Sequence, residues 1–98
     1  MQLNVSENAL LELNKIIEEK QANKNIRVYI AGIGWGGPTF GMALEEPKDD
    51  DLIETSGDIN FIFSQDMVEN FTAINIDYGS SFFRKGFTIT SNRSGGFC

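Results

Sequence analysis

The first apolar positions of the chain repeat with the period of about 3.6 residues that is typical of an amphipathic α-helix. They are Ala9, Leu10, Leu13, Ile16 and Ile17. Ser6 precedes this stripe, and its hydroxyl oxygen is suited to accept one of the unpaired backbone N–H groups at a helix N-terminus. The pattern predicts a helix over about residues 7–21, with residues 1–5 as a short strand or lead-in.

From residue 26 onward, apolar residues fall at every second position, which is the spacing of half-buried β-strands. Strands are predicted at residues 26–31, 40–44, 52–55, 59–63, 74–78 and 87–89. Ser64 is placed to cap a short helix that carries Met67 and Val68. This order predicts an α+β fold, with short, mainly antiparallel strands in mixed small sheets, one N-terminal helix and one short inserted helix. The expected core is Leu10, Leu13, Ile17, Val28, Ile30, Phe40, Met42, Leu44, Phe61, Phe63, Ile74 and Ile76.

Length and composition indicate one globular domain over residues 1–98, with 41% hydrophobic and 22% charged residues. Residues 92–98 are expected to form a flexible tail. The net charge of −6 argues against nucleic acid or an anionic membrane surface as a partner. No apolar run is long enough to span a membrane, and the first residues lack the pattern of a secretory signal, so a cytoplasmic protein is expected.

Two residue types limit the chemistry of the chain, because it has no histidine and its one cysteine is Cys98. A single copy therefore cannot form a Cys/His zinc site, a Ser-His-Asp triad, a Cys–His pair or a disulfide framework. Cys98 alone is a weak metal ligand. It becomes a stronger candidate only if oligomerisation brings several copies together.

A glycine-rich segment follows the strand predicted at residues 26–31. Gly32, Gly34 and Gly37 have the spacing of a dinucleotide-binding fingerprint, but that motif requires a helix to begin at the glycines. Here Pro38 and the residues after it continue as a strand, so we interpret the segment as a tight hairpin loop. A tight loop cannot bury the indole of Trp35. This side chain packs against another element, lines a partner surface, or stands at a former functional position.

The segment after the hairpin is acidic. Its carboxylates are those of Glu45, Glu46, Asp49, Asp50 and Asp51. Carboxylate oxygens bind hard cations, but this spacing does not match the EF-hand loop, which also needs a glycine at its sixth position. We therefore interpret the segment as a solvated acidic loop.

Several segments, taken in order, match the motifs of a known family. They are the strand at 26–31, Gly34-Trp35-Gly36-Gly37, the strand at 40–44, the loop at 47–51, Ile76-Asp77-Tyr78, Gly86-Phe87 and Gly95-Gly96-Phe97-Cys98. With these segments the chain resembles the HesB-like, or A-type iron–sulfur carrier, family along essentially its whole length. The spacing between Ile76-Asp77-Tyr78 and Gly86-Phe87 is the most specific part of the resemblance.

The resemblance implies a HesB-like fold and a role in iron–sulfur cluster assembly as a metal-binding carrier or scaffold, not as an enzyme. In the family, three cysteines of the turn and the tail hold iron or an iron–sulfur cluster, usually across a subunit interface. This implies iron or a cluster as the cofactor, iron–sulfur assembly or acceptor proteins as partners, and a homo-oligomer. Trp35 stands where the family has its turn cysteine, and Cys98 is the one cysteine of the tail, so the ligand set is degenerate.

Two alternatives stay open for the same fold. The first is an interaction or regulatory homologue that binds no cluster and contacts partners through Trp35, Tyr78, Phe82 and Phe83. The second is a thiol or selenol redox protein, because the turn also resembles HesB-like variants that carry selenocysteine. The codon UGA specifies selenocysteine and, in some genetic codes, tryptophan. Residue 35 is then a former Cys or Sec position, with Cys98 as the resolving thiol.

Overall fold

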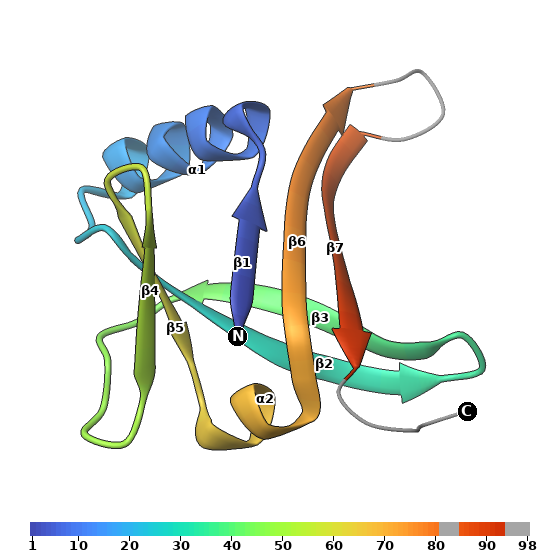
Figure 1. The fold of residues 1–98 in the computed structure, drawn as a ribbon. Helices are drawn as coiled ribbons and strands as arrows, with labels where there is room; N and C mark the ends of the chain where they lie inside the picture. Colours follow the sequence, from blue (N-terminus) through green and yellow to red (C-terminus); the bar gives the residue numbers. More distant parts are fainter. Residues whose placement is uncertain (81–84, 94–98) are drawn as a thin grey trace.

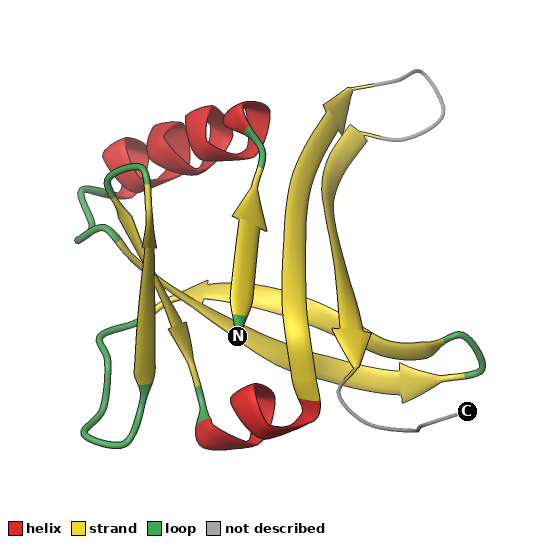
Figure 2. Ribbon diagram, viewed as in Figure 1, coloured by secondary structure: helices red, strands yellow, loops and turns green. Residues whose placement is uncertain are grey.

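Two small β-sheets and two helices form the described part of the chain, residues 1–80 and 85–93, in this computed structural model (Figure 1, Figure 2). The first sheet has the strand order β1-β6-β7, and the second has the order β3-β2-β5-β4. The elements are β1(Gln2–Val5), α1(Glu7–Lys20), β2(Asn25–Gly34), β3(Gly37–Leu44), β4(Leu52–Ser56), β5(Ile59–Phe63), α2(Gln65–Asn70), β6(Phe71–Ser80) and β7(Lys85–Arg93). The predicted α+β architecture with mixed small sheets is confirmed.

Helix α1 begins where its sequence predicts. The hydroxyl of Ser6 accepts a hydrogen bond from the backbone N–H of Ala9 at 3.1 Å. The helix ends at Lys20, because Gln21 takes a left-handed conformation with φ of 53° and its N–H returns to the Glu18 carbonyl. The predicted end at residue 21 is therefore one residue too late. No helix in residues 1–80 or 85–93 is long and apolar enough to cross a membrane.

The strand pairing is both antiparallel and parallel. Hairpins join β2 to β3, β4 to β5, and β6 to β7, whereas β1 pairs with β6 and β2 pairs with β5 in parallel. Figure 1 shows β6 and β7 passing across β2 and β3. Strand β7 extends to Arg93 and pairs with the beginning of β6. Asn92 and Arg93 therefore belong to a strand, which corrects the prediction of a tail from residue 92; residues 94–98 lie outside the described part.

The core lies between the inner faces of the two sheets and the buried face of α1. Its buried residues are Ala9, Leu13, Ile17, Ile26, Val28, Ile59, Phe61, Phe63, Met67, Phe71, Ile74 and Ile76. Leu10, Phe40, Met42 and Leu44, which were also predicted, are partly buried against this cluster. The prediction was wrong for Ile30, which is 40% exposed. The β2–β3 register shifts between Ile30 and Gly32, and β5 pairs only with residues 25–27 of β2. Apolar residues therefore still alternate with polar ones in the sequence of β2, but beyond residue 28 they are no longer buried.

Candidate functional site: the tip of the β2–β3 hairpin

The hairpin of β2 and β3 ends in a turn at Trp35 and Gly36. The last paired residues are Gly34 and Gly37, so only two residues connect the strands. Gly37 has φ of 102°, a conformation that residues with a Cβ atom rarely adopt. The predicted hairpin is confirmed. No helix begins at these glycines, which removes the dinucleotide interpretation.

Trp35 projects into solvent from this turn. It is fully exposed, with 108% of its reference accessible area, and Ile33 is 82% exposed. A Cβ atom built on Gly34 or Gly36 would meet no atom within 4 Å, so the backbone of the turn is also surrounded by open space. Packing of Trp35 against another element of the same chain, one of the three interpretations of the sequence, is therefore absent from the described residues.

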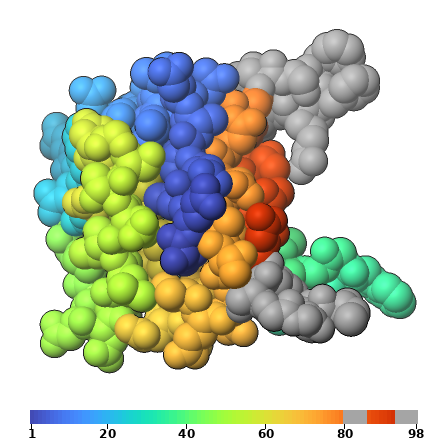
Figure 3. All heavy atoms as spheres, viewed as in Figure 1, coloured from blue at the N-terminus to red at the C-terminus, as the bar shows by residue number. Residues whose placement is uncertain are grey.

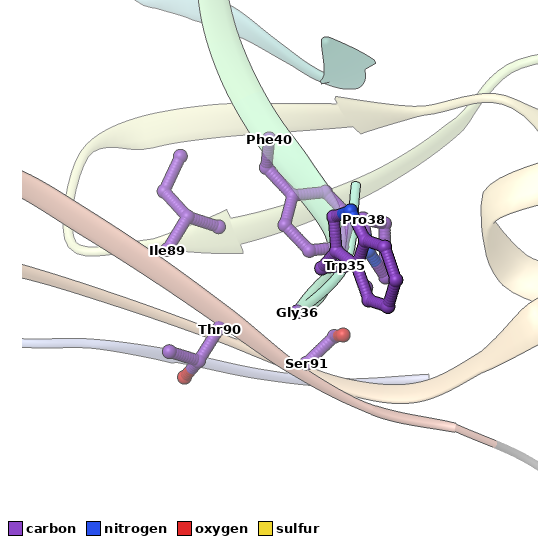
Figure 4. Close-up of a pocket in the computed structure, with 8 residues that line it drawn as sticks. Trp35, Gly36, Pro38, Phe40, Ile89, Thr90 and Ser91 are labelled. Atoms are coloured by element: carbon purple, nitrogen blue, oxygen red, sulfur yellow. The ribbon is translucent and has the colours of Figure 1, made fainter. Parts of the chain in front are cut away.

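A hollow lies beside the turn, between β3 and the second half of β7 (Figure 4). Its volume is about 540 Å³. It is lined by Trp35, Gly36, Gly37, Pro38, Phe40, Ile89, Thr90 and Ser91. The close-up shows the indole of Trp35 next to Pro38, with Ile89, Thr90 and Ser91 on the strand opposite. The hollow thus has aromatic and apolar walls on the hairpin side and the hydroxyl group of Ser91 on the β7 side, whereas the hydroxyl of Thr90 accepts a hydrogen bond from the side-chain amide of Asn75 on β6.

The described residues do not supply a ligand set for iron or an iron–sulfur cluster. An indole carries an N–H donor and no lone pair for a metal, whereas such clusters are held by thiolates. Within residues 1–80 and 85–93, no three His, Cys, Asp or Glu side chains gather in a position to hold a metal ion. Cys98, the other residue predicted for this site, lies outside the described residues, as do Phe82 and Phe83.

Tyr78, the remaining predicted interaction residue, lies at the other end of the β6–β7 hairpin. It is half-buried, and its ring meets the ring of Phe87 edge to face, with 4.8 Å between the ring centroids. It pairs with Phe87 in the strand register, whereas the hollow beside Trp35 is lined by the later β7 residues Ile89, Thr90 and Ser91. The structure therefore does not bring Trp35 and Tyr78 into one site.

Asp77, in the middle of the Ile76-Asp77-Tyr78 motif, has a structural role that sequence reasoning missed. Its carboxylate accepts a hydrogen bond from the hydroxyl of Ser6 at 2.6 Å and another from the backbone N–H of Tyr78 at 2.8 Å. Because the Ser6 hydroxyl also caps α1, the motif fixes the helix N-terminus to β6. The predicted cap at Ser6 was the one signal in the sequence for this contact. A hydroxyl whose oxygen accepts a hydrogen bond from a helix N–H still has a proton to donate to a second group.

The acidic loop is held by the guanidinium of Arg27 on β2 and by the side-chain amides of Asn23 and Asn25. The guanidinium of Arg27 donates to Glu45 at 2.9 Å and forms a two-pronged ion pair with Asp51. This hydrogen bonding lowers the pKa of the Asp51 carboxyl and raises the pKa of Arg27. Glu46 accepts hydrogen bonds from Asn23 and Asn25, which lower the pKa of its carboxyl. These contacts make the loop a structural connection to β2, so describing it only as solvated was incomplete.

Comparison with known proteins finds relatives that are named as iron-sulfur cluster insertion proteins. It is 30% identical over 78 residues to the iron-sulfur cluster insertion protein ErpA of Francisella philomiragia, and this match covers 78% of the chain and 67% of the relative. The same protein of Francisella tularensis subsp. novicida matches over the same length with the same identity. The chain belongs to the A-type iron–sulfur carrier, or HesB-like, family. No model in a scan of protein families matches it.

Solved structures of A-type carriers show the same fold. A crystal structure of IscA with the [2Fe-2S] cluster superimposes with a TM-score of 0.78 at 20% identity, covering 92% of this chain and 85% of that one. The structure of Escherichia coli SufA, involved in biosynthesis of iron-sulfur clusters, also gives 0.78, at 13% identity over 99% of this chain and 86% of that one. In this A-type carrier, Trp35 therefore projects from a hairpin of the family fold, at the place where the sequence resemblance puts a cysteine ligand.

Proposed function

We propose that this A-type carrier acts in iron–sulfur cluster biogenesis, binding or delivering iron or a cluster as cargo and catalysing no reaction of its own. The observation that carries the proposal is the 30% identity to cluster insertion proteins over most of both chains. The proposal includes assembly or acceptor proteins as partners, a homo-oligomer and a cytoplasmic location. The near absence of cysteine, which leaves no disulfide framework, supports an intracellular location.

The cargo site of the proposal is the hairpin tip together with Cys98. Trp35 contributes no thiolate, so the 98 residues supply one cysteine per copy and two per dimer. A cluster with four protein thiolate ligands needs more than a dimer provides. We therefore propose that the native chain holds its cargo weakly, with the missing ligands supplied by small external thiols or by the partner that receives the cargo.

Anaerobic reconstitution with iron and sulfide tests this proposal through visible absorbance. The native chain is expected to take up little cluster. Trp35→Cys is expected to gain the absorbance of a bound cluster, because the turn is open around residue 35. Ile33→Cys is the matched control, since it places an exposed thiol on the same hairpin but outside the turn. Strong uptake by the native chain would show that Cys98 and assembly suffice; no gain in Trp35→Cys would contradict the cargo role.

A second candidate is an interaction or regulatory homologue that has lost the cluster. The exposure of Ile33 and Trp35 favours it, because large apolar side chains on a projecting turn are typical of contact surfaces. It replaces the first candidate if no variant takes up cluster while the folded chain still binds iron–sulfur assembly proteins in a pull-down. Trp35→Ala would then abolish that binding.

A third candidate is a redox protein with a thiol or selenol at position 35 and Cys98 as resolving thiol. The observation in its favour is the full solvent access of the side chain at position 35. A UGG codon for residue 35 in the native gene excludes the selenocysteine form. For the thiol form, Trp35→Cys must form a disulfide with Cys98 under mild oxidation, which mass spectrometry of the unreduced chain detects.

A further inference from the structure

Strand β2 has a neighbouring strand on both sides only over its first residues. Strand β5 pairs with β2 at residues 25–27, and beyond them the one described strand partner of β2 is β3. Residues 29–34 are exposed, except for Gly32, which is half-buried. In the space-filling view the tip of this hairpin protrudes from the rest of the molecule (Figure 3). Residues 29–34 of β2 therefore form an open strand edge on the side away from β3.

An open edge carries unpaired backbone groups. Successive residues of a strand point their N–H and C=O groups to opposite edges, so about half of the peptide groups of residues 29–34 face away from β3. In the part of the chain that the structure describes, no strand pairs with them on that side, and no turn or loop backbone bonds to them. Such groups are suited to an extended segment of another chain, because a strand offers donors and acceptors at the same repeat.

The other strand edges of the two sheets are protected. The edge strands lie against each other, β1 against β4 and β3 against β7. They also have features that oppose pairing with a further strand. Strand β1 is four residues long, β3 contains Pro38, β4 contains Glu54, and β7 begins with Lys85 and ends with Arg93. Residues 29–34 include no charged residue and no proline, so among the described residues this edge alone lacks such protection.

The side chains beside this edge favour an apolar partner strand. On one face of β2 the exposed fraction rises outward, from 1% at Val28 to 40% at Ile30 and 82% at Ile33. The register places Ile30 opposite Phe40 and Ile33 opposite Pro38, so these residues share that face. An added strand would place its alternate side chains next to Ile30 and Ile33, where apolar residues bury the most surface. The register shift after Ile30 bends the edge, so the added strand is short.

Charge distinguishes between the possible occupants of the edge. Residues 28–44 include no charged residue, although the chain has a net charge of −6. An acidic segment is repelled by the chain as a whole, whereas a segment with lysine or arginine at its ends is attracted, and neither end buries a charge at the edge. A second copy of this chain has the same negative charge and is therefore less well matched than a basic segment.

We propose that residues 29–34 of β2 bind an extended apolar segment of a partner protein, flanked by basic residues, which adds to the second sheet as a strand beside β2. The inference rests on the proposed function for the existence of partner proteins, and it adds the surface and the form of the contact. The backbone of β2 supplies the hydrogen bonds, and Ile30 and Ile33 supply the apolar contacts. The added strand begins where the pairing of β5 with β2 ends.

A synthetic peptide tests this contact without iron or sulfide. The probe is a fluorescein-labelled peptide of alternating valine and threonine with a lysine at each end, and fluorescence anisotropy follows its binding to the full chain. The matched control has the same side chains but an N-methyl group on every peptide nitrogen, so it has no backbone N–H to donate. We expect the probe to bind and the control to bind at least about tenfold more weakly. No binding by the probe, or equal binding by both peptides, would overturn the proposal.

Variants locate the contact on β2. Ile33→Lys is expected to weaken binding of the probe by about tenfold, because it replaces an apolar contact with a charge that repels the lysines of the peptide. Ile53→Lys is the matched control, since Ile53 is 46% exposed and lies on β4, so this variant should bind the probe as the native chain does. Circular dichroism confirms that both variants are folded. Equal weakening by the two substitutions would contradict the assignment to β2.

Two further outcomes separate this contact from its alternatives. If sedimentation equilibrium shows that the chain self-associates and that this association excludes the probe, the edge binds a second copy and the proposal fails. No binding of the probe, together with cluster uptake by Trp35→Cys, would remove the added strand and leave the cargo role intact. Binding of the probe at β2, with no cluster uptake by any variant, would do the opposite.

Discussion

The two ends of the β2–β3 hairpin are built from similar residues but lie in opposite surroundings. At the inner end, Ile26 and Val28 are buried, β5 pairs alongside β2, and Arg27 is joined to Glu45 and Asp51. At the outer end, Ile33 and Trp35 are exposed. The apolar residues of the inner end therefore stabilise this chain, whereas those of the tip contribute little to its own stability.

The largest expected effect of a substitution lies at the inner end. Phe61 is fully buried and pairs in register with Ile26. Phe61→Ala is expected to lower the free energy of unfolding by about 3–5 kcal/mol, because it leaves a cavity in the core. Urea unfolding followed by circular dichroism measures this change. A loss below about 1 kcal/mol would mean that the inner end is not the stabilising half of the hairpin.

The next effect comes from the ion pair that connects the inner end to the acidic loop. The side chains of Arg27 and Asp51 are 12% and 8% exposed. Asp51→Asn is expected to cost about 2 kcal/mol of unfolding free energy at neutral pH, since it weakens hydrogen bonds between charged groups. Asp50→Asn, in the same loop at an exposed residue, is the control and should change little.

The same pair predicts a pH dependence. Because the pKa of Asp51 is lower in the folded chain than in the unfolded one, its contribution is complete above the unfolded pKa of about 3.9 and is lost as the pH falls through the folded value. The difference in stability between the native chain and Asp51→Asn should therefore shrink below about pH 4. A difference that grows on acidification would contradict the assigned pKa direction.

A smaller effect is expected from the backbone of the tip. Gly37 has φ of 102°, so Gly37→Ala introduces strain of about 1 kcal/mol. Gly34→Ala is the matched control, because Gly34 is the last paired residue before the turn and a new Cβ atom there has open space around it. Thermal unfolding of both variants compares them. Equal melting temperatures would show that the turn does not require the conformation of Gly37.

The smallest effect on stability is expected at Trp35. Trp35→Ala should change the free energy of unfolding by less than about 0.5 kcal/mol at low chain concentration, because the side chain packs on nothing in its own chain. Urea unfolding at two concentrations measures it. A large loss in dilute solution would show that the tip supports the fold after all, and would end the contrast between the two halves.

Local patterns predicted most of the secondary structure, because helices and strands depend on spacing and capping that the sequence displays. The cap at Ser6, the hairpin around Trp35 and the short helix after Ser64 were all correct. The prediction was wrong at Ile30, where a register shift and the absence of β5 leave an apolar residue exposed. Alternation in a sequence shows which residues share a face of a strand, but not whether another element covers that face.

The candidate site was only partly visible in the sequence. The unusual position of Trp35 and the resemblance in the turn singled out the tip, but nothing in the spacing of residues placed Ser91 of β7 next to it. The hollow exists because β7 passes beside β3, a contact between segments far apart in the chain. The pairing of Asp77 with Ser6 was missed for the same reason.

Residue types and their local spacing were enough to predict the helices and most of the strands, and they show that the chain has no histidine and a single cysteine. That β5 supports one end of the hairpin and leaves the other end projecting, and that Trp35 lies in solvent beside a hollow, became visible only in the folded chain. Burial depends on which distant segments pack against a residue, and that packing is fixed only when the whole chain folds.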